Sequence, residues 1–177
     1  MTIIRPGRCY HHINKMAYTR ISKKRPKKGY VKGVPVSKIH HFETGDAKHL
    51  SSFPLVYDIV TMMDRQMRSN CLEAARQSAT KYLTAKLGDN GFFLKVRIFP
   101  HHVLREKALA TGAGADRFSQ GMRMSFGRPA NQAARVKAGQ KIITARAPAG
   151  KDAEIKEALR RATMKLPGNC RIVLDAQ

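Results

Sequence analysis

Apolar runs and amphipathic segments alternate in the middle of the chain, and this alternation predicts a folded core. Residues 55–63 (LVYDIVTMM) are β-branched and apolar without Gly or Pro, which is typical of a buried strand. From Ser69 or Asn70, either of them a good N-cap, apolar residues then recur at helical spacing. Gly88 marks the end of this predicted helix, because glycine readily follows the last helical turn.

The same order of elements recurs towards the C-terminus. Residues 92–99 alternate apolar with basic side chains and predict the strand that follows the first helix. Residues 141–147 predict another strand, a helix begins at Asp152 and stops before 167–168 (Pro-Gly), and residues 170–175 predict a last strand. Strand–helix–strand therefore occurs twice, which predicts an α+β fold with two helices on one face of a mixed sheet.

Two regions have little periodicity and are expected to lie outside this core. Residues 1–50 contain RISKKRPKKGYVKG, which is rich in Lys, Arg, Pro and Gly and predicts a basic N-terminal arm. The core domain is then 51–177, interrupted by a flexible central loop at about 102–118.

The net charge of the chain indicates what kind of partner the protein binds. The 177 residues include 34 Lys and Arg against 12 Asp and Glu, a net charge of +22. Such self-repulsion destabilises a compact chain unless a polyanion neutralises it, so nucleic acid is the expected partner and an anionic membrane surface the second choice. No apolar run is long enough to span a bilayer. We therefore expect no membrane association.

The positive charge is concentrated in the two regions outside the predicted core. Residues 1–50 carry a net charge of +10 and residues 101–146 a net charge of +7. Tyr10, Tyr18 and Tyr30 are interleaved with the basic residues of the arm, and tyrosine rings can stack on RNA bases. We interpret the arm as RNA-binding, and nothing in it resembles a base-reading helix for duplex DNA.

The glycine-rich segment GAGADR leaves several interpretations open. Gly112 and Gly114 begin a GxGxxG pattern, but Arg117 stands where its third glycine should be, so nucleotide binding is weakly supported. The glycines could simply make a mobile loop. We favour a loop that contacts nucleic acid through Arg105, Lys107, Arg117 and Arg123.

Chemistry at a metal or catalytic centre has little support in the sequence. The histidine pairs at 11–12, 40–41 and 101–102 are poor chelators because neighbours on a strand point in opposite directions, so they are expected to contact RNA or solvent. Glu106 and Asp116 have basic neighbours and are expected to pair with them. Three cysteines without a CxxC indicate a reducing compartment. We therefore expect no cofactor, no metal, no small-molecule substrate and no enzymatic activity.

Eight short motifs together resemble one protein family. They are RCY (8–10), YTR (18–20), YVKGVP (30–35), LEAAR (72–76), KVRIFPHHVLRE (95–106), GADRFSQGMRMSFGRP (114–129), ARV-x-x-GQ (134–140) and EALRRA (157–162). In this order they are similar to the large-subunit ribosomal proteins called L-ten-e in archaea and eukaryotes and L-sixteen in bacteria. The archaeal branch is the most similar. Met124 and Ser125 depart from the Gly-Ala that is more usual in the family.

The resemblance implies a fold, a location and partners. It implies an α/β-hammerhead-like α+β fold in the cytoplasmic large ribosomal subunit, bound to large-subunit rRNA near the 5S rRNA region and to neighbouring ribosomal proteins. It also implies that the central loop points towards tRNA acceptor arms near the peptidyl-transferase centre. An RNA-processing or RNA-modifying enzyme with a cationic surface is the alternative.

Specific side chains carry these expectations. The expected rRNA-binding residues are Arg5, Arg8, Lys15, Arg20, Lys23, Lys24, Arg25, Lys27, Lys28, Lys32, Arg123, Arg128 and Arg135. The expected tRNA-facing residues are Arg105, Lys107, Gly112, Gly114 and Arg117.

Overall fold

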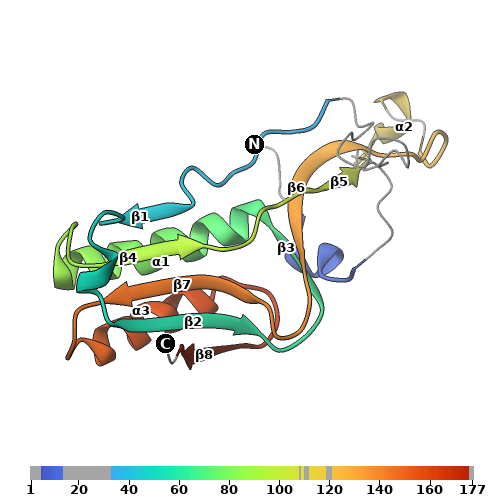
Figure 1. Ribbon diagram of the computed structural model, residues 1–177. Coiled ribbons are helices and arrows are strands. Elements are labelled where there is room, and N and C mark those ends of the chain that lie inside the picture. Colours follow the sequence, from blue (N-terminus) through green and yellow to red (C-terminus); the bar gives the residue numbers. More distant parts are fainter. Residues whose placement is uncertain (1–4, 14–32, 108, 110–111, 119–120, 176–177) are drawn as a thin grey trace, which may run out of the picture.

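Two antiparallel sheets and two long helices make up the computed structural model of the protein (Figure 1). The structure describes residues 5–13, 33–107, 109, 112–118 and 121–175. In chain order the elements are η1 (Gly7–Tyr10), β1 (Glu43–Gly45), η2 (Leu50–Ser52), β2 (Leu55–Thr61), β3 (Arg65–Arg68), α1 (Ser69–Leu87), β4 (Phe93–Val96), β5 (His102–Glu106), α2 (Ala115–Phe118), β6 (Arg128–Val136), β7 (Lys141–Ala147), α3 (Asp152–Thr163) and β8 (Cys170–Leu174).

The larger sheet has five strands in the order β1-β4-β7-β2-β8. Each unit predicted from the sequence, β2–α1–β4 and β7–α3–β8, leaves a gap one strand wide between its two parallel strands. A strand of the other unit fills each gap, so every neighbouring pair is antiparallel. The α+β class is thus confirmed, whereas the expected mixed sheet is antiparallel throughout the described residues.

Both helices cover one face of this sheet and bury the main core (Figure 1). Leu72 and Leu83 of α1 and Ile155 and Leu159 of α3 are fully buried together with Ile143 of β7. These residues recur at helical or strand spacing in the sequence, which is why the core elements could be recognised from the pattern alone.

The smaller sheet, β3-β6-β5, was not expected from the sequence. The long strand β6 pairs with β3 through its C-terminal half and with β5 through its N-terminal half. Because His102–Glu106 form β5, the predicted loop begins after Glu106 and not at residue 102. Figure 1 shows α2 beyond the far end of this sheet, away from the two long helices.

A shared corner joins the two sheets. β2 continues into β3 and β6 continues into β7, and the two turns between these strands bind each other. Thr61 N donates to Gln140 O (3.2 Å), and Gly139 N donates to Thr61 O (2.8 Å). Asp64 Oδ1 accepts a hydrogen bond from Ala138 N (2.8 Å). The corner therefore fixes the smaller sheet relative to the larger one.

The ends of the elements correct two further expectations. The helix N-cap is Arg68, which has no side-chain capping bond, because β3 runs directly into α1. Ser69 is buried in the first turn, where its hydroxyl donates to Asn131 Oδ1 (2.9 Å). Gly88 follows α1 with a φ of 79°, as expected of a glycine at this position.

Residues 33–50 contribute β1 and the buried Ile39, so this part of the expected arm packs with the core.

A buried ion pair attaches residues 40–44 to α1. Glu73 accepts hydrogen bonds from Arg76 (2.6 Å) and from Gln77 (2.9 Å). Glu73 also lies 3.4 Å from the backbone N of His40, and Arg76 donates to Thr44 Oγ1 (3.2 Å). Burial raises the pKa of Glu73, but the bonds from Arg76 and Gln77 outweigh it, so the pKa lies below its ordinary value of 4.5.

Glu73→Gln should destabilise the protein by about 3 kcal/mol at pH 7, because Arg76 would lose its buried counter-charge. The folded-state pKa of Glu73 is depressed, so its contribution is present above pH 4.5 and is lost as the pH falls through the folded-state value. The difference between variant and wild type in urea unfolding should therefore shrink below pH 4.5. Glu43→Gln, in a half-exposed pair with Lys95, is the control and should change little.

Candidate nucleic-acid interface

Internal partners engage most of the acidic side chains. Ten of the twelve acids form an ion pair or hydrogen bond within the chain: Glu43, Asp46, Asp58, Asp64, Glu73, Glu106, Asp152, Glu154, Glu157 and Asp175. Hydrogen bonds from Arg160 and Arg161 lower the pKa of Glu157 to about 2, so it remains ionised. Even if every acid were paired, the +22 charge would remain for an external polyanion.

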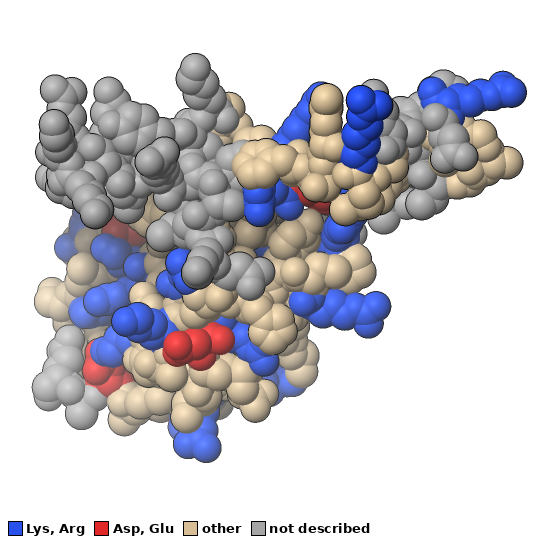
Figure 2. Space-filling model, turned by 90° about the vertical axis from the view of Figure 1, so that its right-hand side faces the viewer, with Lys and Arg blue, Asp and Glu red and all other residues tan. Residues whose placement is uncertain are grey.

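The side of the molecule that carries the smaller sheet presents many cations. Figure 2 shows this side, with Lys and Arg spread across it and Asp and Glu visible at few places. Among the described residues of this region, the exposed basic side chains are Arg5, Arg8, Arg105, Arg117, Arg123 and Arg128. They come from the N-terminal segment, from β5, from the chain between β5 and β6 and from the start of β6, so the fold gathers cations that are distant in sequence.

The expected arm can be examined in part. Arg5 and Arg8 are exposed, Arg5 just before η1 and Arg8 within it. The other eight expected rRNA-binding residues of the arm lie outside the described residues: Lys15, Arg20, Lys23, Lys24, Arg25, Lys27, Lys28 and Lys32. Their role stays a prediction.

The N-terminal segment is attached to the base of the central loop. Arg5 Nε forms an ion pair with Glu106 Oε1 (2.7 Å), and Arg5 Nη2 donates to Lys107 O (3.3 Å). Tyr10 donates its hydroxyl hydrogen to Glu106 Oε2 (3.2 Å). Sequence reasoning expected Glu106 to pair with its neighbours Arg105 and Lys107. The structure instead gives it partners about a hundred residues away.

A buried polar network holds the same segment against β3. Gln66 N donates to His11 O (2.9 Å), Gln66 Nε2 donates to Tyr10 O (3.0 Å), and Gln66 Oε1 accepts from His102 Nδ1. Burial lowers the pKa of His102, and the nearby Arg135 lowers it further. His102 is therefore a neutral structural residue, which corrects the expectation for this one histidine, whereas His12, His40, His41 and His101 are exposed.

Two of the expected tRNA-facing cations lie at the loop base. Arg105, on β5, places its guanidinium carbon 4.4 Å from the ring centroid of Phe126. Lys107 Nζ donates to the backbone oxygens of Arg123 and, at 3.0 Å, of Met124. Both side chains thus bind residues 123–126, where the loop returns to the smaller sheet, and so fix the start of the loop to its end.

The remaining loop residues are more open. Gly112 and Gly114 have φ values of 129° and 80°, a backbone region that favours glycine, and a Cβ at either would have open space around it. Arg117 lies on the short helix α2 and is exposed. Conformational need, and not crowding, therefore explains these two glycines.

Exposed apolar side chains near the loop were missed by the sequence analysis. Met122, Met124 and Phe126 are 69%, 79% and 64% exposed and alternate with Arg123 and other small or polar residues. Their alternation with polar residues, at a period of two, was the sequence pattern that could have identified them. Met124 has a φ of 53°, the left-handed region that glycine favours, at a position where glycine is more usual in the family that the chain resembles.

The other expected rRNA-binding residues lie on or near β6. Arg123 and Arg128 are exposed, and Arg135 is half-buried next to the His102 site. Within the described ranges, no three His, Cys, Asp or Glu side chains are grouped as a metal ion would need. None of the described helices is both long and apolar enough to cross a membrane.

These features define a class: a small, strongly cationic α+β protein in which most acids have internal partners and many cations are exposed. Comparison of the sequence with protein-family models gives a match over residues 16–173 to the family described as ribosomal protein L16p/L10e. The chain therefore belongs to this family, as the sequence motifs indicated.

Archaeal relatives match over nearly the whole length. The chain is 46% identical over 172 residues to the large ribosomal subunit protein uL16 of Thermofilum pendens, covering 97% of both chains. It is 45% identical over 171 residues to the protein of that name from Methanococcus aeolicus, covering 97% of this chain and 94% of the relative. The Pyrobaculum neutrophilum protein is 45% identical over 176 residues, covering 98% and 93%.

Glu106→Gln should loosen the N-terminal segment, because Arg5 would lose its charged partner and Tyr10 a strong acceptor. Amide exchange of Cys9 and Gln66, whose N–H groups bind within or to this segment, should become faster. The melting temperature should change little, since the pair is partly exposed. Glu154→Gln, in a comparable pair on α3, is the control; unchanged exchange at Cys9 and Gln66 would show that Glu106 does not hold the segment.

Proposed function

We propose that this protein is a structural constituent of the large subunit of the cytoplasmic ribosome, bound there to rRNA and to neighbouring ribosomal proteins. Membership of the L16p/L10e family supports this assignment, as do relatives that carry the name large ribosomal subunit protein uL16. The observation that carries the RNA-binding role is the outward-facing positive charge that remains after the acids find internal partners. In this role the protein neutralises phosphates and catalyses no reaction.

We further propose that the central loop, including Arg117, contacts tRNA during translation. The loop projects beyond the smaller sheet in Figure 1, and clamps at its base hold its two ends together. Gly112 and Gly114 keep the chain thin, so it can enter a narrow space between RNA strands. Under this proposal the N-terminal arm lies along rRNA near the 5S rRNA region, and the loop approaches tRNA acceptor arms.

Binding to large-subunit rRNA should weaken steeply with salt. Each phosphate contact that a cation makes releases counterions, so log K should fall by about 0.7–0.9 per contact for each tenfold rise in salt. Arg128→Gln should lower this slope by roughly one contact without favouring one RNA sequence over another. Filter binding at several salt concentrations measures the slope. Lys86→Gln is the control, because Lys86 lies in the last turn of α1, at the opposite end of this helix from β3. An affinity of the wild type that does not change with salt would contradict phosphate binding.

Replacing residues 108–116 with a short Gly-Ser linker should leave the melting temperature and rRNA binding nearly unchanged. Of the side chains described in this stretch, Leu109 is the large apolar one and is 39% exposed, so little buried area is lost. Loop-closure entropy also changes only modestly, and Lys107 keeps its hydrogen bonds to the backbone oxygens of Arg123 and Met124. Particles carrying the variant should make peptide more slowly or mature incompletely.

Arg117→Gln is the matched test of charge in this loop. It leaves the loop length and the base clamps intact, so a smaller defect of the same kind would assign part of the effect to this cation. Unfolding of the linker variant would instead make the loop a structural support. Full translation rates for the linker variant would show that the loop is dispensable.

A further inference from the structure

The segment that joins β4 to β5 exposes a basic side chain and two rings. From Val96 to His102 buried and exposed residues alternate strictly. The outward residues are Arg97, Phe99 and His101. A hydrogen bond from His101 N to Phe99 O (3.1 Å) turns the chain at Pro100 and brings the two rings together. The segment therefore exposes a cation two residues before a pair of adjacent rings.

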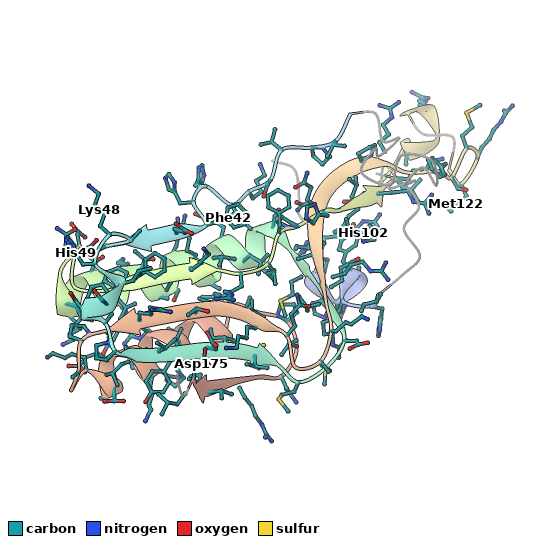
Figure 3. All side chains as sticks on the ribbon, viewed as in Figure 1. Phe42, Lys48, His49, His102, Met122 and Asp175 are labelled. Carbon is teal, nitrogen blue, oxygen red and sulfur yellow. The ribbon has the colours of Figure 1, made fainter. Side chains whose placement is uncertain are left out.

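Phe99 is held in place although it is 48% exposed. Its ring stacks on Phe42, with centroids 5.3 Å apart and planes inclined by 18°, and His101 lies against it with centroids 4.5 Å apart. Phe42 in turn packs against the main core, and its carbonyl accepts a hydrogen bond from Val96 N (2.7 Å). Figure 3 places Phe42 beside β1 and His102 at the start of β5, so the ring cluster spans the junction of the sheets.

The charges around the rings favour a polyanion over a protein partner. Arg97 is exposed, and Glu43, which follows Phe42 in the sequence, is bound to Lys95 (2.6 Å). Asp175 lies within electrostatic reach of Arg97, but its carboxylate already binds Lys141 (2.6 Å). Rings that are fixed, half-exposed and flanked by cations are the arrangement with which proteins bind single-stranded nucleic acid.

We propose that Phe99, supported by Phe42 and flanked by His101, is a stacking platform for an unpaired RNA base, and that Arg97 binds the phosphate of that nucleotide. The inference rests on the RNA-binding function proposed above and adds to it a contact that depends on a base. Stacking is tolerant of base identity, since every base has a π-face. Two residues span at most about 7 Å of chain, so one nucleotide can reach both the Phe99 ring and the Arg97 guanidinium.

The test uses the full-length protein and a single-stranded adenosine RNA 12-mer that carries one 2-aminopurine. Stacking on a ring should quench 2-aminopurine fluorescence. Phe99→Leu keeps an apolar side chain over Phe42 but removes the π-face, so it should reduce the quenching and weaken binding about 5- to 150-fold. The dependence of log K on log salt should stay unchanged, because no phosphate contact is lost.

Two control variants separate stacking from folding and from charge. Phe99→Tyr should retain both quenching and affinity, and Met164→Ala, which removes a 68% exposed side chain from the end of α3, should change neither. Arg97→Gln should lower the salt slope by about one contact. Melting curves of all variants should coincide with that of the wild type.

The outcomes distinguish this proposal from the function on which it rests. If wild-type binding is steeply salt-dependent but Phe99→Leu binds and quenches like the wild type, the platform is wrong and RNA binding stands. If the wild type does not bind RNA even at low salt, the proposed function fails as well. A photo-crosslinking residue at position 99 should react with rRNA in assembled subunits, and a crosslink to a protein would overturn the proposal.

Discussion

The hydrogen-bonded corner between the two sheets is the constraint on which the rest of the structure depends. Thr61 exchanges backbone bonds with the 139–140 turn, and Asp64 holds the same turn through Ala138. Because two strands of each sheet enter this corner, the smaller sheet cannot turn without breaking several bonds together. The N-terminal segment, the loop base and the ring cluster are all attached to that sheet or to its junction, so their relative positions follow from the corner.

Most of the larger sheet and its helices could be predicted because their burial follows simple periods. Ile155, Leu159 and Ala162 repeat at helical spacing, and the residues of β2 and β7 form short apolar runs. The smaller sheet could not be predicted in this way. β3 reads RQMR, yet Gln66 and Arg68 are buried because they bind Tyr10 O and Arg5 O. A hydrophobic pattern cannot predict the burial of polar residues whose hydrogen-bond partners lie far away in the sequence.

The candidate interface was predictable in composition but not in detail. Net charge identified the kind of partner, and the glycines identified a loop. Neither could reveal that Arg5 and Lys107 also hold the loop base together, because those bonds join residues separated by 16 to 102 positions. These cations thus contribute to the shape of the free protein. Arg105 and Glu106, the last two residues of the family motif 95–106, thus have structural roles at the loop base.

The internal engagement of the carboxylates has a consequence for the protein before it reaches its binding site. A chain that has committed its acids to its own fold cannot reduce its positive field by rearranging its surface. Any polyanion can therefore compete for newly made molecules of a protein with a net charge of +22. The lifetime of each such encounter is set by ionic strength and by competition among these polymers. Delivery to the correct site is then a problem of exchange between partners, and folding alone does not solve it.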